Sequence, residues 1–253
     1  MVQIEYITKS INEAITKCSQ GLTLNKSVKK VLDNFHKETI NRKTEKGLLI
    51  NDKGEIIHSK NGGEHSVDIW KNIDEQRLYE ENGAFHIEHN HPSFSKDFHY
   101  CECLSNDDIL NVLSTVKQAD GRGGLWEEYC VKSITAEGAN GSRMTLVRGD
   151  DFSDNDRKLF TEARLELAKA HDDYVHNQYG KLQKQILDKL VDESRVKNGN
   201  DETLKNIMDL DREASNQAIK ELGVFEKSDV FKKIQKKFRD ANCKLIVESG
   251  NYV

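Results

Sequence analysis

The sequence predicts an α/β fold in which a mixed sheet with helices occupies residues 45–150, and helical segments precede and follow it. Before residue 45 and after residue 150, apolar residues recur every three or four positions, which is the spacing of one helix face. Between these limits, short apolar runs alternate with turn sequences, which is typical of strands. We therefore expect an N-terminal helical arm (1–44), an α/β domain (45–150) and a helical C-terminal region (151–253).

The elements before residue 150 follow from these periods. Gly21 is expected to separate two helices of the arm, whose apolar residues at helical spacing are Ile11, Ala14, Ile15, Cys18 and Leu22, then Val28, Val31, Leu32 and Phe35. The predicted strands of the domain are 47–50, 55–58, 67–69, 85–89, 129–135 and 142–148. Ser105 is predicted to begin a helix that continues to Val116.

After residue 150 the chain is predicted to be helical and charged. An apolar stripe from Leu159 to Leu190 predicts one long helix or two, and the helix after the break at 197–200 is expected to end at Gly223. Ser228 is expected to cap a last, basic helix at 231–239. Because the stripe is too long for one small core to cover, it must be buried either by folding back as a helical hairpin or against another subunit, so self-association or a partner at these C-terminal helices is possible.

Net charge, cysteine count and the distribution of apolar residues limit the classes of protein to which the chain could belong. The formal net charge of −5 and the 32% charged residues argue against a chain that coats nucleic acid, although helix 231–239 keeps a weak nucleic-acid contact open. The five cysteines, an odd number, predict free thiols in a reducing compartment. No leader segment and no long apolar run is found, so we expect a soluble, cytoplasmic protein without membrane contact.

A candidate metal site lies at the end of strand 85–89. His89 and His91 are two residues apart, and the pleat of a strand places both imidazoles on one face. Catalytic zinc takes three protein ligands and keeps one position open, and Asp108 in the following helix is the best third ligand. Glu45, near the start of the first strand, is placed to act as general base.

The order of these residues resembles a known family. Glu45, then His89-Asn90-His91-Pro92, then Ser105 with Asp108 is similar to the motif of JAMM metalloproteases, which include isopeptidases and RadC-like and phage-borne relatives. The resemblance covers about residues 45–148. It implies a JAB/MPN-like, cytidine-deaminase-like fold that holds zinc through His89, His91 and Asp108.

The resemblance also implies an activity. Glu45 would activate water, and Ser105 would stabilise the tetrahedral intermediate while an amide or isopeptide bond of a protein or peptide substrate is cleaved. If the chain is phage-encoded, it could be virion-associated rather than cytoplasmic. A chain truncated after about residue 150 is expected to keep the zinc site and lose self-association.

Several alternatives remain open at this stage. The spacer between Pro92 and Ser105 is longer than the usual one and Glu45 precedes Gly47 by one residue fewer than in eukaryotic members, so Glu55 and Glu64 are reserve bases. Ser105 and Asp108 are also explained as a helix capping box. His86 and Glu88 either hydrogen-bond the metal ligands from outside or are ordinary polar residues of the strand. His99, Cys101 and Cys103 are candidates for a second metal site.

The residues disfavour two other enzyme classes, the HNH nucleases and the zinc deaminases of nucleic acids. His89-Asn90-His91 only spells the name of the HNH nucleases, whose three residues lie on different elements, and the Pro-Cys-x-x-Cys of zinc deaminases is absent. The rival to an enzyme is a structural or assembly protein, for example of phage head morphogenesis, that uses the core as a scaffold and works through its helical arms.

Overall fold

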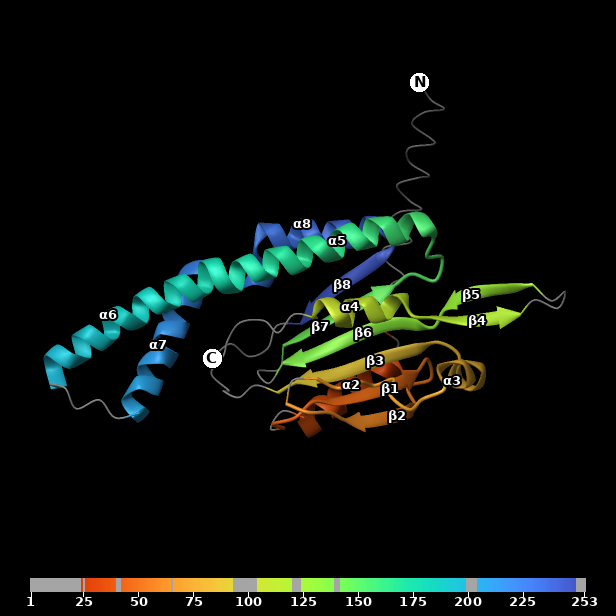
Figure 1. Cartoon of the computed structure of the whole chain (residues 1–253), viewed down its shortest axis with the longest axis horizontal. Coiled ribbons are helices and arrows are strands. Elements are labelled where there is room, and N and C mark those ends of the chain that lie inside the picture. Colours follow the sequence, from red (N-terminus) through yellow and green to blue (C-terminus); the bar gives the residue numbers. More distant parts are fainter. Residues whose placement is uncertain are drawn as a thin grey trace, which may run out of the picture.

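The computed structural model shows a mixed sheet covered by helices, with a long helical arm on one side (Figure 1). The structure describes residue 24 and residues 26–39, 42–64, 66–92, 104–119, 124–138, 142–198 and 204–248. The predicted helix with residues 11–22 lies outside these residues. The predicted second helix of the N-terminal arm is confirmed as α2, Lys26–Thr39.

The main sheet has six strands in the order β2-β1-β3-β6-β7-β8. Their bounds are β1 Lys46–Asn51, β2 Ile56–Asn61, β3 Phe85–His91, β6 Val131–Gly138, β7 Arg143–Arg148 and β8 Cys243–Glu248. Only β3 and β6 run parallel, and every other neighbouring pair is antiparallel. The predicted mixed sheet is therefore confirmed, with β3 and β6 at its centre.

The helix that begins after Ser105 is shorter than predicted. Helix α4 spans Asn106–Leu110 and continues only as a 3-10 turn, Asn111–Leu113. The prediction that Val116 belongs to this helix is wrong, because Val116 lies in strand β4, Thr115–Ala119. β4 pairs with β5, Leu125–Tyr129, as a separate antiparallel ribbon that projects from the main sheet (Figure 1).

Two further elements differ from the sequence-based expectation. Residues 67–69 form no strand: Val67 and Ile69 alternate like strand residues, but both pack close to Gly47 within a loop. Helix α3, Glu75–Asn82, was not predicted, because none of its residues is fully buried and it therefore shows no apolar stripe. Its ends follow ordinary capping, with the Asp74 side chain accepting the Arg77 N–H at its start.

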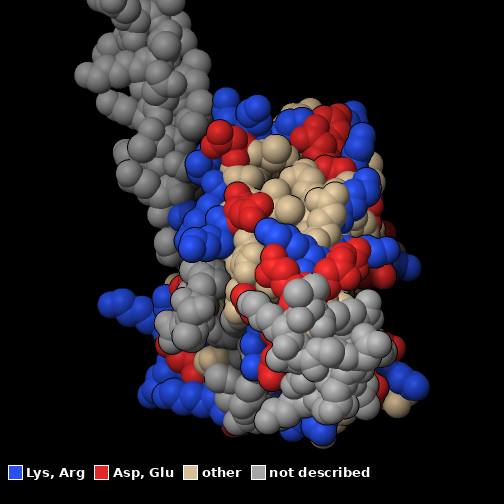
Figure 2. Space-filling view, turned by 90° about the vertical axis from the view of Figure 1, so that its left-hand side faces the viewer, with Lys and Arg blue, Asp and Glu red and all other residues tan. Residues whose placement is uncertain are grey.

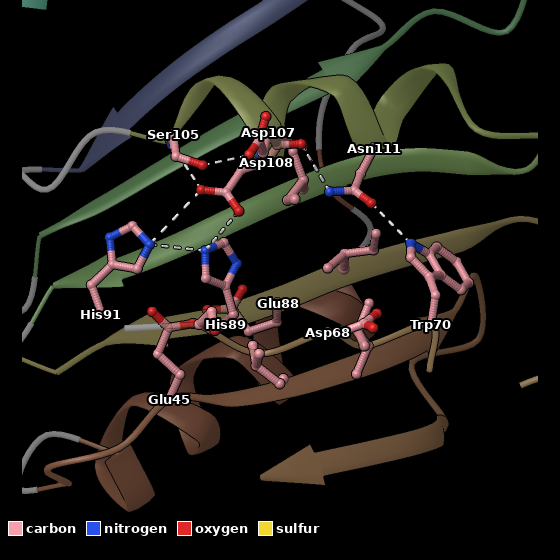
Figure 3. A pocket seen from close by; sticks show the side chains of 16 residues that line it. Glu45, Asp68, Trp70, Glu88, His89, His91, Ser105, Asp107, Asp108 and Asn111 are labelled. Atoms are coloured by element: carbon pink, nitrogen blue, oxygen red, sulfur yellow. Dashed lines mark hydrogen bonds and ion pairs between the residues drawn. The ribbon is translucent and has the colours of Figure 1, made fainter. Parts of the chain in front are cut away.

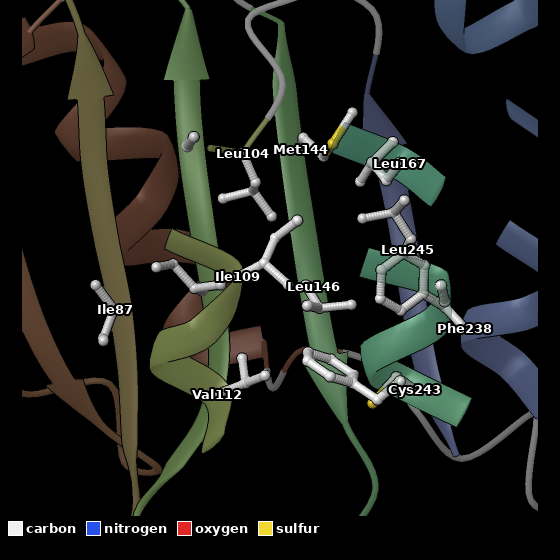
Figure 4. Packing of buried hydrophobic residues seen from close by; sticks show 14 of the residues in the cluster. Ile87, Leu104, Ile109, Val112, Met144, Leu146, Leu167, Phe238, Cys243 and Leu245 are labelled. Carbon is white, nitrogen blue, oxygen red and sulfur yellow. The ribbon is translucent and has the colours of Figure 1, made fainter. Parts of the chain in front are cut away.

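Helices cover both faces of the sheet. On one face, α2 packs Val28, Leu32 and Phe35 against Leu48 and Ile50 of β1. The opposite face carries the larger core, where α4, α5 (Asp154–Asp172) and α8 (Asp229–Asp240) pack on the sheet. Figure 4 shows this packing, with side chains from these helices directed at the strands. The labelled residues all belong to the buried apolar cluster: Ile87, Leu104, Ile109, Val112, Met144, Leu146, Leu167, Phe238, Cys243 and Leu245.

The predicted long helix is confirmed and forms the arm. α5 continues through a π-helical turn, Asp173–Tyr179, into α6, Gly180–Asn198, and α7, Leu204–Leu222, returns beside α6 (Figure 1). As predicted, α7 ends at Gly223, which has a φ of 77°, and Ser228 caps α8. No described helix combines the length and the apolar character that a membrane crossing needs.

The C-terminal region is not only helical. Strand β8 pairs with β7 along its whole length, from Arg148 and Cys243 to Arg143 and Glu248. Phe160 and Leu167 of α5 and Phe238 of α8 belong to the same apolar cluster as the strands. Residues on both sides of position 150 therefore build one sheet and one core.

The surface charges are mixed, as the nearly balanced composition suggests. Seen from the end of the arm, acidic and basic side chains alternate over the described surface (Figure 2). In the basic helix predicted at 231–239, Phe231, Ile234 and Phe238 are buried, while Lys232 and Lys237 form ion pairs with Asp229 and Glu166. This helix thus presents a charged, solvated face above a packed one.

Candidate metal centre

The pleat of β3 separates its side chains into two sets. His89 and His91 share one face with Ile87, which packs into the larger core, whereas Glu88 and Asn90 belong to the other face. β3 is hydrogen-bonded to β1 on one side and to β6 on the other, so its end is held firmly. The two imidazoles approach each other there, with 3.0 Å between their Nε2 atoms.

Asp108 reaches the same point from the start of α4. The Ser105 side chain accepts the Asp108 N–H, and the Asp108 carboxylate accepts the Ser105 N–H at 2.7 Å, which is a capping box. Buried Leu104 and Ile109 attach this short helix to the core. The carboxylate therefore faces β3, with Oδ1 3.2 Å from His89 Nε2 and Oδ2 3.8 Å from His91 Nε2 (Figure 3).

The three side chains fit a zinc ion. One ligand atom from each of His89, His91 and Asp108 can be chosen so that all lie within 4.8 Å of one another. Ligand atoms about 2.0–2.1 Å from a tetrahedral zinc ion are roughly 3.3 Å apart. The two Nε2 atoms (3.0 Å) and the pair of His89 Nε2 with Asp108 Oδ1 (3.2 Å) lie near this separation, whereas His91 Nε2 is 3.8 Å from the other carboxylate oxygen, Oδ2. Two imidazoles and one carboxylate are also a ligand set that catalytic zinc sites use, and they leave a fourth position open.

Burial and neighbouring charges shift the pKa values of the three candidate ligands. Burial raises the pKa of Asp108, but the hydrogen bond and the charge of His89 outweigh it and hold this pKa well below its usual range. Burial lowers the pKa of His91 to about 4, helped by repulsion from His89. Burial also lowers the pKa of His89, yet its bond to Asp108 and the charge of Glu45 raise it overall. At neutral pH, Asp108 and His91 are in the forms that bind zinc.

Glu45 lies beside these ligands. It immediately precedes β1, two residues before Gly47, whose partner in β3 is His89. Its carboxylate points toward the imidazoles from the β1 side (Figure 3), and only 7% of the residue is exposed. The reserve bases Glu55 and Glu64 do not line this pocket, and Glu55 binds the Asn51 amide instead.

The site opens into a pocket of about 310 Å³. Its floor includes Gly47 and Ile87, and one wall is the loop 66–70, which contains the residues 67–69 predicted as a strand. Trp70 joins this wall to the end of α4, because its indole N–H donates to Asn111 Oδ1 at 2.9 Å. The sequence offered no signal for this wall, because its apolar residues have the alternation of a strand.

The remaining predicted residues take other places. Ser105 lines the pocket in addition to capping α4. His86 contacts Ser133 and Asp52 on the opposite face of β3, away from the metal ligands. Cys130 and Cys243 are free and buried, in line with the expected free thiols. His99, Cys101 and Cys103 lie outside the described residues.

The sequence did not predict a buried cluster of charged residues on the α2 side of the sheet. Arg143 of β7 donates to Glu137 of β6, to Asp33 of α2 and to Glu248 of β8. His36 of α2 lies 3.3 Å from Glu137, at its Nδ1 atom. These residues are spread over more than 200 positions of the chain, so no local pattern announces them.

Comparison of the chain with family models, with curated proteins and with solved structures found no match.

Proposed function

We propose that the protein is a zinc-dependent hydrolase that cleaves an amide bond, either in a peptide backbone or in an isopeptide linkage. The observation that supports this most strongly is the meeting of His89, His91 and Asp108 at an open pocket that also contains the carboxylate of Glu45. Four such residues come from three separate elements, and each is one that hydrolytic zinc sites use. The same residues carry the resemblance to JAMM metalloproteases.

The proposed mechanism assigns metal binding to three residues and proton transfer to a fourth. His89, His91 and Asp108 would hold zinc, which supplies a Lewis acid that polarises a carbonyl and lowers the pKa of water toward about 7. Glu45 accepts the proton of the attacking water and delivers it to the leaving nitrogen. Glu45 lines the pocket, and only 7% of this residue is exposed.

Ser105 can cap helix α4 and also donate a hydrogen bond to the reacting group. Its oxygen accepts the Asp108 N–H, at 3.1 Å, which leaves the hydroxyl hydrogen to donate. A hydroxyl that lines the pocket next to a metal ligand can donate to the oxyanion that develops during attack on the amide. The capping bond fixes the position of the oxygen, and this is what preorganised stabilisation requires.

The first experiment measures metal and hydrolysis together. Purified protein should bind about one zinc per chain, and Asp108→Asn should weaken zinc binding at least about 100-fold in a calorimetric titration, because it removes a charged ligand. Asp107→Asn is the matched control, since Asp107 is the exposed neighbour in the same helix turn and lines the same pocket. Equal zinc affinity in both variants would refute the metal site.

Hydrolysis is tested with a library of internally quenched fluorescent peptides and with a lysine-linked isopeptide probe. Glu45→Gln should retain zinc and lose hydrolysis by about 100-fold or more, the usual contribution of a general base. Glu55→Gln should change little, because Glu55 lies outside the pocket. A zinc-loaded wild-type protein that cleaves neither probe, or a Glu45→Gln variant as active as wild type, counts against the proposal.

A role in assembly is the second candidate, and one observation favours it. The helical arm formed by α6 and α7 extends beyond the sheet and does not border the metal pocket (Figure 1). A pair of helices that extends beyond the sheet is suited to contact another chain. Sedimentation velocity of the whole protein decides this: an oligomer that dissociates when the arm is shortened supports assembly, whereas a monomer opposes self-association.

A further inference from the structure

The backbone of Glu45 is held on one edge by the segment that follows β2. The Glu45 N–H donates to the Gly63 carbonyl at 2.7 Å, and the Gly62 N–H donates to the Glu45 carbonyl at 2.8 Å. This pair of bonds continues the β1–β2 ladder by one residue beyond the strand. On this edge, main-chain bonds hold the backbone of Glu45.

On the other edge, a side chain replaces the main chain. The backbone ladder between β1 and β3 ends at the pair Gly47 and His89. Beyond that pair, the Lys46 N–H donates to Asn90 Oδ1 at 2.7 Å, and Asn90 Nδ2 donates to the Thr44 carbonyl at 3.4 Å. Asn90 is 3% exposed, so these bonds are shielded from water.

We propose that Asn90 is a positioning residue for the base: its amide clamps the backbone on both sides of Glu45 and so holds the Glu45 carboxylate in the pocket beside His89 and His91. The catalytic consequence rests on the proposed function, whereas the clamp is a structural property that can be tested without a substrate. Asn90 lies between the two candidate ligands in sequence, so one strand end positions both the metal ligands and the base.

The chemistry of the side chain explains why an amide suits this place. The clamp needs one acceptor for the Lys46 N–H and one donor for the Thr44 carbonyl, and a carboxamide carries both in one plane. Aspartate supplies only the acceptor when it is ionised, and alanine supplies neither. A base displaced by about 1 Å can lose about 100-fold in rate, so a modest loosening of residues 44–46 has a measurable effect.

The test compares Asn90→Ala with Ser133→Ala. Ser133 is a matched control, because it is buried on the same sheet face and bonds His86 at 2.7 Å, but does not contact residues 44–46. In Asn90→Ala, hydrogen exchange of the Lys46 amide should accelerate by about tenfold or more, because the amide loses its acceptor. Ser133→Ala should leave this exchange unchanged.

Activity on the cleaved peptide probe then shows whether the clamp acts through the base. Asn90→Ala should retain one zinc and lower kcat by about 10- to 100-fold with little change in KM. In the Glu45→Gln background, the same substitution should cause no further loss, because the base that it positions is already absent. An equal loss in both backgrounds would overturn the proposal, since Asn90 would then not act through Glu45.

Two further outcomes keep the clamp separate from the proposed function. If wild-type protein hydrolyses nothing, the proposed function fails, and the clamp is judged by Lys46 exchange and by the place of Glu45 in a crystal structure of Asn90→Ala. An unshifted Glu45 or unchanged exchange overturns the clamp. If Asn90→Ala does not fold, Asn90→Asp takes its place: it should keep Lys46 exchange slow yet lower kcat, and wild-type kcat in it overturns the proposal.

Discussion

At the scale of single residues, the most unusual groups after the candidate metal ligands are the carboxyl groups beneath α2. Glu137 is 1% exposed, and burial raises its pKa to about 7, although the Arg143 guanidinium opposes this shift. Glu88, which is fully buried nearby, has its pKa raised in the same way by burial and by Glu137. Burial and the charge of Arg143 lower the pKa of His36, the imidazole closest to Glu137. The contacts of this cluster join α2 to the sheet, and their contribution to the free energy of unfolding depends on pH.

The first prediction at this scale concerns Glu137. Its pKa is 4.5 in an ordinary setting and about 7 in the fold, so between these values the folded protein keeps a proton that the unfolded chain has released. Its contribution to stability is therefore greatest below pH 4.5 and falls as the pH rises toward 7, by at most about 1.4 kcal/mol per pH unit. Glu137→Gln should flatten this part of the dependence of unfolding free energy on pH.

Urea unfolding between pH 4 and 8 measures the effect. Glu248→Gln is the control, because Glu248 contacts the same Arg143 guanidinium from a more exposed position. It separates the loss of a contact to Arg143 from the loss of a buried carboxyl group. Glu137→Gln curves parallel to those of wild type throughout this range would contradict the prediction.

At the scale of elements, the loop after β2 supports both Glu45 and the pocket wall. Gly62 and Gly63 pair with the Glu45 backbone, and the chain then turns back so that the Gly63 N–H donates to the Ser66 carbonyl at 2.9 Å. Val67 and Ile69, which follow in the wall, lie against Gly47 of β1. The loop therefore links Glu45, the proposed base, to the pocket wall through close backbone contacts.

Gly62 is the point at which this loop tolerates no side chain. A Cβ atom there would lie 2.2 Å from the Ser66 carbonyl oxygen, whereas at Gly63 the same atom would lie 4.0 Å from it. Gly62→Ala should thus displace the loop, lower the unfolding free energy by about 2 kcal/mol or more and reduce hydrolysis. Gly63→Ala is its matched control and should change both much less. Thermal unfolding and peptide cleavage of the two variants, compared with wild type, test this; equal effects would disprove it.

The sequence predicts the parts of the site whose cause is local, but it misses helix α3, which lacks an apolar stripe, and contacts between distant segments. The pleat that pairs His89 with His91 and the capping box of Ser105 and Asp108 depend on residues at most three positions apart. Strand β8 pairs with β7 across about a hundred residues, and it could not be predicted because its partner is set by the packing of α5 and α8. The Asn90 clamp is equally non-local, as it joins residues 44 positions apart or more.

At the scale of the whole molecule, the chain after residue 150 serves two purposes. α5, α8 and β8 complete the core, because Phe160, Phe238 and Leu245 pack against the strands that precede them. The distal parts of α6 and α7 lie away from the sheet and contact mainly each other (Figure 1). The Gln183 side chain donates to Asp211 Oδ1 at 2.6 Å, and this contact marks a level at which the two arm helices lie side by side.

Because α5, α8 and β8 complete the core, a chain truncated after residue 150 is no longer expected to keep its zinc site. A chain that ends at residue 150 lacks β8, so β7, whose six residues are all buried, becomes an edge strand with Met144 and Leu146 uncovered. We expect it to aggregate and to bind less than one zinc per chain, because exposed strand edges and apolar surface favour association. Replacing residues 184–210 by a short Gly-Ser linker between Gln183 and Asp211 should leave folding and zinc binding intact, since it removes only the end of the arm. Circular dichroism, zinc analysis and sedimentation velocity of both chains test this, and a monomeric, zinc-loaded chain 1–150 would instead establish residues 45–150 as an independent domain.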